Sequence, residues 1–197
     1  MSLGRAVRVW LWLSIGFAGA VVVLGVADDA GIPAARALLG HTPPSLLRPA
    51  PTPGPARVAG IPEDYLRWYE RAAATCEGLD WSVLAAVGKA ESDHGRSPLP
   101  GVRSGANAAG AAGPMQLGIG GKAGRTWQRY LTDADHDGTA RVYDPPDAIT
   151  AAARKLCRDG ASAGDPRGAL WAYNPSASYV SRVLAQARRY AREGRSP

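Results

Sequence analysis

The sequence predicts an all-α domain with long loops, and three observations lead to that class. Apolar residues recur at three- and four-residue spacing in several segments beyond Gly60. Runs that alternate apolar and polar residues are never longer than a few residues in this sequence. Apolar residues make up 46% of the 197 residues, which is enough to form the core of one globular domain.

The first 27 residues have the pattern of an export segment. Arg5 and Arg8 precede an uncharged apolar run over residues 9–27. As a helix this run would span roughly 28 Å, close to the ~30 Å hydrocarbon thickness of a bilayer, so it could be a retained transmembrane anchor. Small residues at 25–27 also resemble a signal-peptide cleavage site. Both alternatives place the rest of the chain outside the cytoplasm.

Residues 28–60 predict a linker, because they contain seven prolines and no sustained periodicity. We expect the helical domain to cover residues 61–193, followed by a short tail at 194–197. Pro62 and the acidic residues after it favour the start of a first helix. Its expected inner stripe comprises Tyr65, Trp68, Tyr69, Ala72 and Cys76.

The next predicted helix, over residues 80–95, carries a carboxylate where an apolar residue is expected. At 100° per residue, Glu91 shares one stripe with Leu84, Val87 and Gly88. Burying an ionised carboxylate costs several kcal/mol unless it is paired or protonated, so Glu91 needs a compensating role. Catalysis is one such role, and a structural carboxylate that caps another helix is the alternative.

Three later segments complete the helical pattern. Residues 149–156 form a stripe that begins after Asp144 and two prolines, and residues 169–173 form a short one. The last helix, with apolar residues recurring from Tyr179 to Ala191, has arginines on its other faces. Between the predicted helix that contains Glu91 and these later helices, residues 97–124 are expected to form a long functional loop.

Three short motifs bear on Glu91: Glu91-Ser92, Gly113-Pro114-Met115-Gln116 and Ala172-Tyr173-Asn174. In this order, in an exported helical domain, they resemble the lytic transglycosylases (SLT type) of the lysozyme-like superfamily, over about residues 61–193. The resemblance implies cleavage of the β-1,4 bond between N-acetylmuramic acid and N-acetylglucosamine in peptidoglycan, leaving 1,6-anhydro ends. It implies no cofactor for catalysis. A lysozyme-type hydrolase of the same bond and a non-catalytic wall-binding module are the alternatives.

The resemblance implies that Glu91 acts first as acid and then as base. An apolar surrounding raises the pKa of a glutamate, which keeps the carboxyl protonated near neutral pH. Glycosidases commonly use a second carboxylate, and Asp93 is the nearest. Asp93 points about 160° away on the helix and follows Lys89 by four residues, so we expect a solvated ion pair there instead.

By the same resemblance, Gln116, Tyr173 and Asn174 would line a substrate groove. Ser92 is expected to hydrogen-bond within the site or to backbone. Met115 belongs to the substrate-binding motif, although a core plug beneath the loop is the simpler expectation for its side chain. Tyr173 could likewise be a core residue with its hydroxyl bonded to backbone, and Asn174 before Pro175 could start a turn.

An acidic segment predicts a calcium loop. It has the spacing of an EF-hand, with a glycine at the sixth position, and its candidate ligands are Asp133, Asp135, Asp137, Thr139 and Asp144. Asp144 replaces the usual glutamate, and Arg141 stands where a water-bridging oxygen is common. Some lytic transglycosylases contain a related loop. We expect structural calcium here, with a merely acidic surface loop as the alternative.

The two cysteines indicate a cross-link, and the net charge limits the kinds of partner that we expect. In an exported domain, Cys76 and Cys157 predict a disulfide, with two free buried thiols as the alternative. The formal charge is +6, but from residue 61 onward 18 Lys and Arg face 15 Asp and Glu. This balance gives little support to a nucleic-acid partner. The expected partners are peptidoglycan strands and, if the N-terminal segment is retained, the membrane. We expect a monomer.

Overall fold

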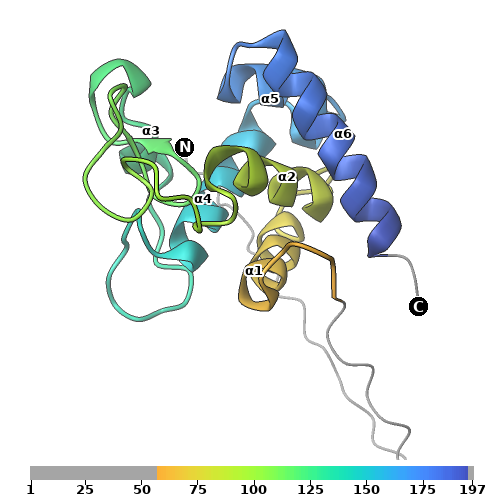
Figure 1. Ribbon diagram of the computed structural model, residues 1–197, viewed down its shortest axis with the longest axis horizontal. Coiled ribbons are helices and arrows are strands. Elements are labelled where there is room, and N and C mark those ends of the chain that lie inside the picture. Colours follow the sequence, from red (N-terminus) through yellow and green to blue (C-terminus); the bar gives the residue numbers. More distant parts are fainter. Residues whose placement is uncertain (1–56, 195–197) are drawn as a thin grey trace, which may run out of the picture. The chain divides into compact units, whose positions relative to one another are not determined.

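Helix α2 (Trp81–Ser92) lies at the centre of the helices in the computed structural model, which describes residues 57–194 (Figure 1). It packs against α1 (Glu63–Ala73), α6 (Ala177–Glu193) and α4 (Pro145–Arg158). Because it is enclosed by three helices, α2 is apolar on most of its surface. Its fully or almost fully buried apolar side chains are Leu84, Ala85, Ala86 and Val87. The all-α class expected from the sequence is confirmed.

The remaining elements are short. They are the strands β1 (Ala111–Ala112) and β2 (Leu117–Gly118), the 3-10 turns η1 (Gly121–Ala123) and η2 (Ala161–Ala163), and the helices α3 (Thr126–Tyr130) and α5 (Pro166–Tyr173). Side chains cap several helix starts. Asp80 accepts a hydrogen bond from the amide of Ser82 at 2.8 Å, and Ser176 accepts one from the amide of Tyr179.

The first helix is shorter than its apolar stripe predicted. Helix α1 ends at Ala73, so Cys76 lies in the turn that follows. There the hydroxyl of Thr75 donates to the carbonyl of Ala72 at 2.7 Å, which satisfies one of the free carbonyls at the helix end. Trp68, also expected inside, is only partly buried, whereas Leu66 is in the core.

The predicted disulfide joins Cys76 to Cys157, in the last turn of α4. It links residues 81 positions apart in the chain and fastens the turn after α1 to α4, against which α1 packs. A disulfide stabilises the folded state mainly by restricting the conformations of the unfolded chain.

Residues 97–124, expected to be an irregular loop, contain a small β-hairpin. Strands β1 and β2 pair antiparallel, Ala112 opposite Leu117, so that the motif residues 113–116 form the turn between them. The amide of Gln116 donates to the carbonyl of Gly113 at 3.0 Å across this turn. Gly113 has a φ of +76°, and a Cβ there would lie 1.8 Å from the carbonyl oxygen of Val142. Glycine is therefore required at the first residue of the turn.

The predicted export segment over residues 9–27 lies outside the described residues, as does most of the predicted linker. Among the helices of residues 57–194, none is long and apolar enough to cross a membrane.

Candidate active site

Glu91 lies in the last turn of α2, and its side chain is partly buried. The three other members of its stripe, Leu84, Val87 and Gly88, are buried. The hydroxyl of Tyr179, in the first turn of α6, donates a hydrogen bond of 2.6 Å to Oε1 of Glu91. The inward direction inferred from helical periodicity agrees with this position, because the carboxylate meets a side chain of the packed helix α6.

Burial raises the pKa of Glu91 from 4.5 to about 7, and the hydrogen bond from Tyr179 opposes part of that rise. A carboxyl group with such a pKa is partly protonated and partly ionised near neutral pH. It can therefore donate a proton in one step and accept one in the next, which a normal glutamate does poorly. Glu91 has the electrostatic properties of a general acid and base.

Tyr179 was not expected as a site residue, because the sequence placed it simply in the apolar stripe of the last helix. Its place in the apolar stripe indicated that it is buried, and a buried tyrosine hydroxyl normally requires a hydrogen-bond partner. The identity of the partner, 88 residues away, is set only by the packing of α6 on α2.

Ser92 joins the end of α2 to the β1–β2 turn. Its buried hydroxyl donates to the carbonyl of Pro114 at 2.5 Å and accepts from the amide of Gly95 at 2.7 Å. This role agrees with the expectation of hydrogen bonds to backbone. Because its only proton and one of its two lone pairs are used, Ser92 fixes the turn beside Glu91 and cannot donate a further hydrogen bond to a ligand.

Tyr173, at the end of α5, holds the next residue of the same turn. Its hydroxyl donates to the carbonyl of Met115 at 2.7 Å, and its pKa is raised by burial and then by the nearby Glu91 carboxylate. Tyr173 thus lies close to the acid with its hydroxyl bonded to backbone. The side chain of Met115 is fully buried in the core, so it has the position of a core plug and offers no surface for direct sugar contact.

Gln116 is fixed by hydrogen bonds on both sides of its amide. Its Nε2 donates to the carbonyl of Gly113 at 2.9 Å, and its Oε1 accepts from Nδ2 of Asn107 at 2.9 Å. The backbone of Gln116 adopts a φ of +47°, which is uncommon for a non-glycine residue. Asn107, which the motifs did not indicate, supports the hairpin further by accepting from the amides of Ala109 and Ala111.

Asn174 follows α5 in extended conformation, with its side chain partly exposed. Its carbonyl accepts a hydrogen bond from the amide of Ser176 at 2.7 Å, in the short connection that leads into α6. Asn174 therefore lies between the segment of Tyr173 and the helix that carries Tyr179. The structure brings all three motifs together around Glu91.

Asp93, the carboxylate nearest to Glu91 in the sequence, is engaged in ion pairs. It caps α2 in a left-handed conformation and forms ion pairs with Lys89 and, at 2.9 Å, with Arg96. Hydrogen bonds from Arg96 and then Lys89 lower its pKa to about 2. The predicted solvated ion pair is confirmed. Within residues 57–194, Tyr179 provides the side-chain hydrogen bond to Glu91, and no carboxylate does.

The acidic segment brings together a ligand set that differs from the predicted one. Carboxylate oxygens of Asp133, Asp135 and the buried Asp147 lie within 4.8 Å of one another. Asp147, missed by the sequence analysis, also accepts from the amides of Ala134 and Arg141. Asp137 instead forms an ion pair of 2.6 Å with Arg141. Arg141 is the residue that departs from the calcium-loop pattern. The backbone amide of Thr139 donates a hydrogen bond to the carboxylate of Asp137.

Asp144, the expected twelfth-position ligand, stands at the N-cap of α4. Its Oδ2 atom is buried and has no hydrogen-bond partner among the described residues. Burial and then the Asp147 carboxylate raise its pKa to about 6. The three clustered carboxylates and the unpaired oxygen of Asp144 have the donor chemistry that a hard cation such as calcium prefers, so these residues fit the ion.

The helical fold and the single desolvated carboxyl group at the end of α2 define a lysozyme-like domain. A family model described as the transglycosylase SLT domain matches residues 69–195, and the chain belongs to this family. The match confirms the resemblance inferred from the three motifs, and it assigns a peptidoglycan-acting function of the lytic transglycosylase type. Comparisons with curated proteins and with solved structures gave no match.

Proposed function

We propose that this protein is a lytic transglycosylase that cuts peptidoglycan strands between N-acetylmuramic acid and N-acetylglucosamine, with Glu91 as its single acid and base. The observation that carries the proposal is the position of Glu91, whose pKa of about 7 results from burial at the meeting point of the three motifs. The ion-paired state of Asp93 supports a mechanism with one carboxyl group.

In the first step, protonated Glu91 gives its proton to the glycosidic oxygen as the bond from that oxygen to the anomeric carbon breaks. The carbonyl oxygen of the muramic N-acetyl group assists by bonding to the anomeric carbon. Glu91 becomes a carboxylate, which the hydroxyl of Tyr179 stabilises through its hydrogen bond of 2.6 Å.

In the second step, the Glu91 carboxylate takes the proton of the muramic 6-hydroxyl. The 6-oxygen bonds to the anomeric carbon and the N-acetyl oxygen leaves it, giving a 1,6-anhydro ring. Glu91 is protonated again and no water is consumed. Gln116, Asn174 and the turn fixed by Ser92 and Tyr173 would line the substrate groove beside the reacting sugar.

Replacement of Glu91 by Gln tests the catalytic role. The amide keeps the size of the side chain but neither donates an acidic proton nor accepts one, so we expect lysis of purified peptidoglycan to fall by at least about a hundredfold. Glu70→Gln is a matched control, because Glu70 is exposed on α1. Equal lysis by both variants would contradict a catalytic role for Glu91, and an absence of lysis by the parent and both variants would support the non-catalytic wall-binding module.

A structural calcium ion would be held by Asp133, Asp135, Asp147 and Asp144. Calcium neutralises clustered carboxylates and would fix the segment that precedes α4. We expect calcium to raise the melting temperature of chelated protein, and Asp147→Asn to remove most of that rise. An unchanged melting temperature after calcium addition would argue for an acidic surface loop without a metal.

The N-terminal residues 1–27 would carry the domain to the cell envelope, as a signal peptide or as a membrane anchor, with residues 28–60 as the linker. The catalytic domain at 61–193 would act as a monomer. Membrane fractionation of the expressed full chain distinguishes the two fates of the N-terminal segment, because a retained anchor sediments with membranes.

A further inference from the structure

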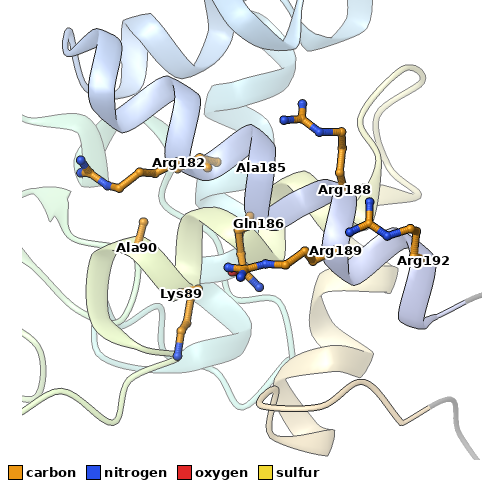
Figure 2. Close-up of a pocket in the computed structure, with 10 residues that line it drawn as sticks. Lys89, Ala90, Arg182, Ala185, Gln186, Arg188, Arg189 and Arg192 are labelled. Carbon is orange, nitrogen blue, oxygen red and sulfur yellow. The ribbon is translucent and has the colours of Figure 1, made fainter.

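A cationic cavity lies between α2 and α6, next to the proposed catalytic acid. Its volume is about 560 Å³. Ala90 and Ala185 are among its apolar lining residues (Figure 2). Five cationic side chains line it: Lys89, Arg182, Arg188, Arg189 and Arg192. None of the residues that line it in the described part of the chain is acidic.

The positive charge of this cavity is largely uncompensated. Lys89 is paired with Asp93, but Arg182, Arg188 and Arg189 form no ion pair with a carboxylate of residues 57–194. Like charges that share one helix surface repel each other, which costs stability unless an anion is bound. Three arginines without a carboxylate partner among residues 57–194 therefore indicate a binding function more than a stabilising one.

One end of the cavity lies at the residue that precedes Glu91 in α2. Ala90, the neighbour of Glu91 in α2, lines one end of the cavity together with Arg182 (Figure 2). Arg182 follows Tyr179 by one helical turn and acts on that hydroxyl by lowering its pKa against the effect of burial. From this end the cavity extends along α6 toward Arg188 and Arg189. A group attached to a sugar at Glu91 would have to extend along α6 to meet these arginines.

We propose that the α2–α6 cavity binds the acidic peptide that peptidoglycan carries on its muramic residues, by pairing peptide carboxylates with Arg188 and Arg189. This inference rests on the proposed function, because it needs a glycan strand at Glu91. Guanidinium groups bind carboxylates through charge-assisted hydrogen bonds. The volume is in the range that encloses a small ligand, which suits a short attached peptide better than a long anionic polymer.

Binding of catalytically inactive protein to defined glycan strands tests the proposal. Glu91→Gln protein is used throughout, so that the measurement does not depend on cleavage. It is sedimented with peptidoglycan freed of phosphate-containing polymers, either intact or stripped of its peptides by an amidase. The comparison is then repeated with R188Q/R189Q added. The control is R154Q/R158Q, which removes the same charge from exposed positions of α4.

We expect Glu91→Gln protein to bind intact strands about fivefold more tightly than stripped strands, because two exposed charge pairs would contribute to the affinity. R188Q/R189Q should remove that preference, and R154Q/R158Q should keep it. A preference that survives R188Q/R189Q overturns the proposal. An equal loss of affinity for both kinds of strand in R188Q/R189Q also overturns it. A loss of affinity that is seen only when phosphate polymers are left on the peptidoglycan overturns it as well. If the protein binds intact strands but wild-type protein cuts neither kind, the proposed catalytic function fails while the peptide site stands.

Discussion

At the scale of single residues, Glu91 combines two conflicting demands. Its carboxyl group must be desolvated to keep a pKa of about 7, and desolvation costs free energy whenever the group is ionised. The hydrogen bond from Tyr179 lowers this cost without removing it. The site is therefore expected to reduce the stability of the fold at neutral and alkaline pH.

Glu91→Gln should stabilise the protein at pH 8. Because the pKa of Glu91 is higher in the folded state than its ordinary value of 4.5, stability is lost as the pH rises from 4.5 through about 7. The neutral amide avoids this loss, so we expect a gain on the order of 2 kcal/mol at pH 8 and a much smaller gain at pH 5. Urea unfolding at both pH values measures it, and a gain that is the same at both would contradict the assigned pKa.

Tyr179→Phe should raise the pKa of Glu91 further, because the removed hydrogen bond lowers it. The alkaline limb of the kcat/KM profile, where protonated Glu91 is lost, should then move to higher pH. We also expect activity to fall by about tenfold or more, as for a lost hydrogen bond to a charged group. Tyr143→Phe is the control, since the hydroxyl of Tyr143 bonds to the carbonyl of Gly105 and, within residues 57–194, to no carboxylate. An unchanged pH profile would show that Tyr179 does not act on the acid.

Helical periodicity was sufficient to single out Glu91 and to direct Asp93 away from it. It could not identify Tyr179, Asn107 or Asp147. Their partners lie between 2 and 88 residues away, most of them in other turns and helices, and depend on how these segments pack. Short-range patterns determine the direction of a side chain, whereas its contacts depend on tertiary structure.

At the scale of elements, side-chain hydroxyl groups hold the β1–β2 turn against α2, the helix that carries Glu91. Ser92 from α2 and Tyr173 from α5 bond to the consecutive carbonyls of Pro114 and Met115. Two helices therefore hold one turn from both sides, which explains why the motif residues are distributed over three segments of the chain. The hairpin itself was missed because strands of two residues are too short to produce an alternating pattern.

Removal of the disulfide by Cys76→Ser with Cys157→Ser should destabilise the domain. The bridge closes a loop of 81 residues, for which the chain-entropy estimate is about 4 kcal/mol. Urea unfolding of the oxidised parent and the double variant measures the loss. The two proteins should have the same helical circular dichroism before unfolding. Equal unfolding midpoints would show that the bridge is absent or without effect in solution.

At the scale of the whole domain, a buried histidine links three helices. His94 bonds through Nδ1 to the hydroxyl of Tyr69 at 2.9 Å, from α1, and through Nε2 to Tyr190 at 3.1 Å, from α6. Gly88 of α2 makes room for this chain of contacts, because a Cβ at Gly88 would lie 1.9 Å from the Tyr69 hydroxyl. The periodicity of the sequence predicted the helices that meet here, but the left-handed His94 beyond the end of α2 gave no periodic signal.

His94 should make the domain sensitive to acid. Burial, reinforced by Arg96, lowers its pKa from 6.5 to about 4. The stability that neutral His94 provides is thus complete above pH 6.5 and is lost as the pH falls toward 4, by on the order of 2 kcal/mol. His94→Gln should be less stable than the parent at pH 7, and the difference should narrow at pH 4. A difference that stays constant over this range would contradict a buried neutral imidazole.

The composition of the products tests the central claim most directly. Purified peptidoglycan is digested with wild-type protein in water enriched in oxygen-18, and the masses of the new muramic ends are measured. A single acid and base that closes the 6-oxygen onto the anomeric carbon predicts anhydro ends, one water lighter than reducing ends and free of the label. Reducing ends that carry oxygen-18 would contradict this account and establish a hydrolase.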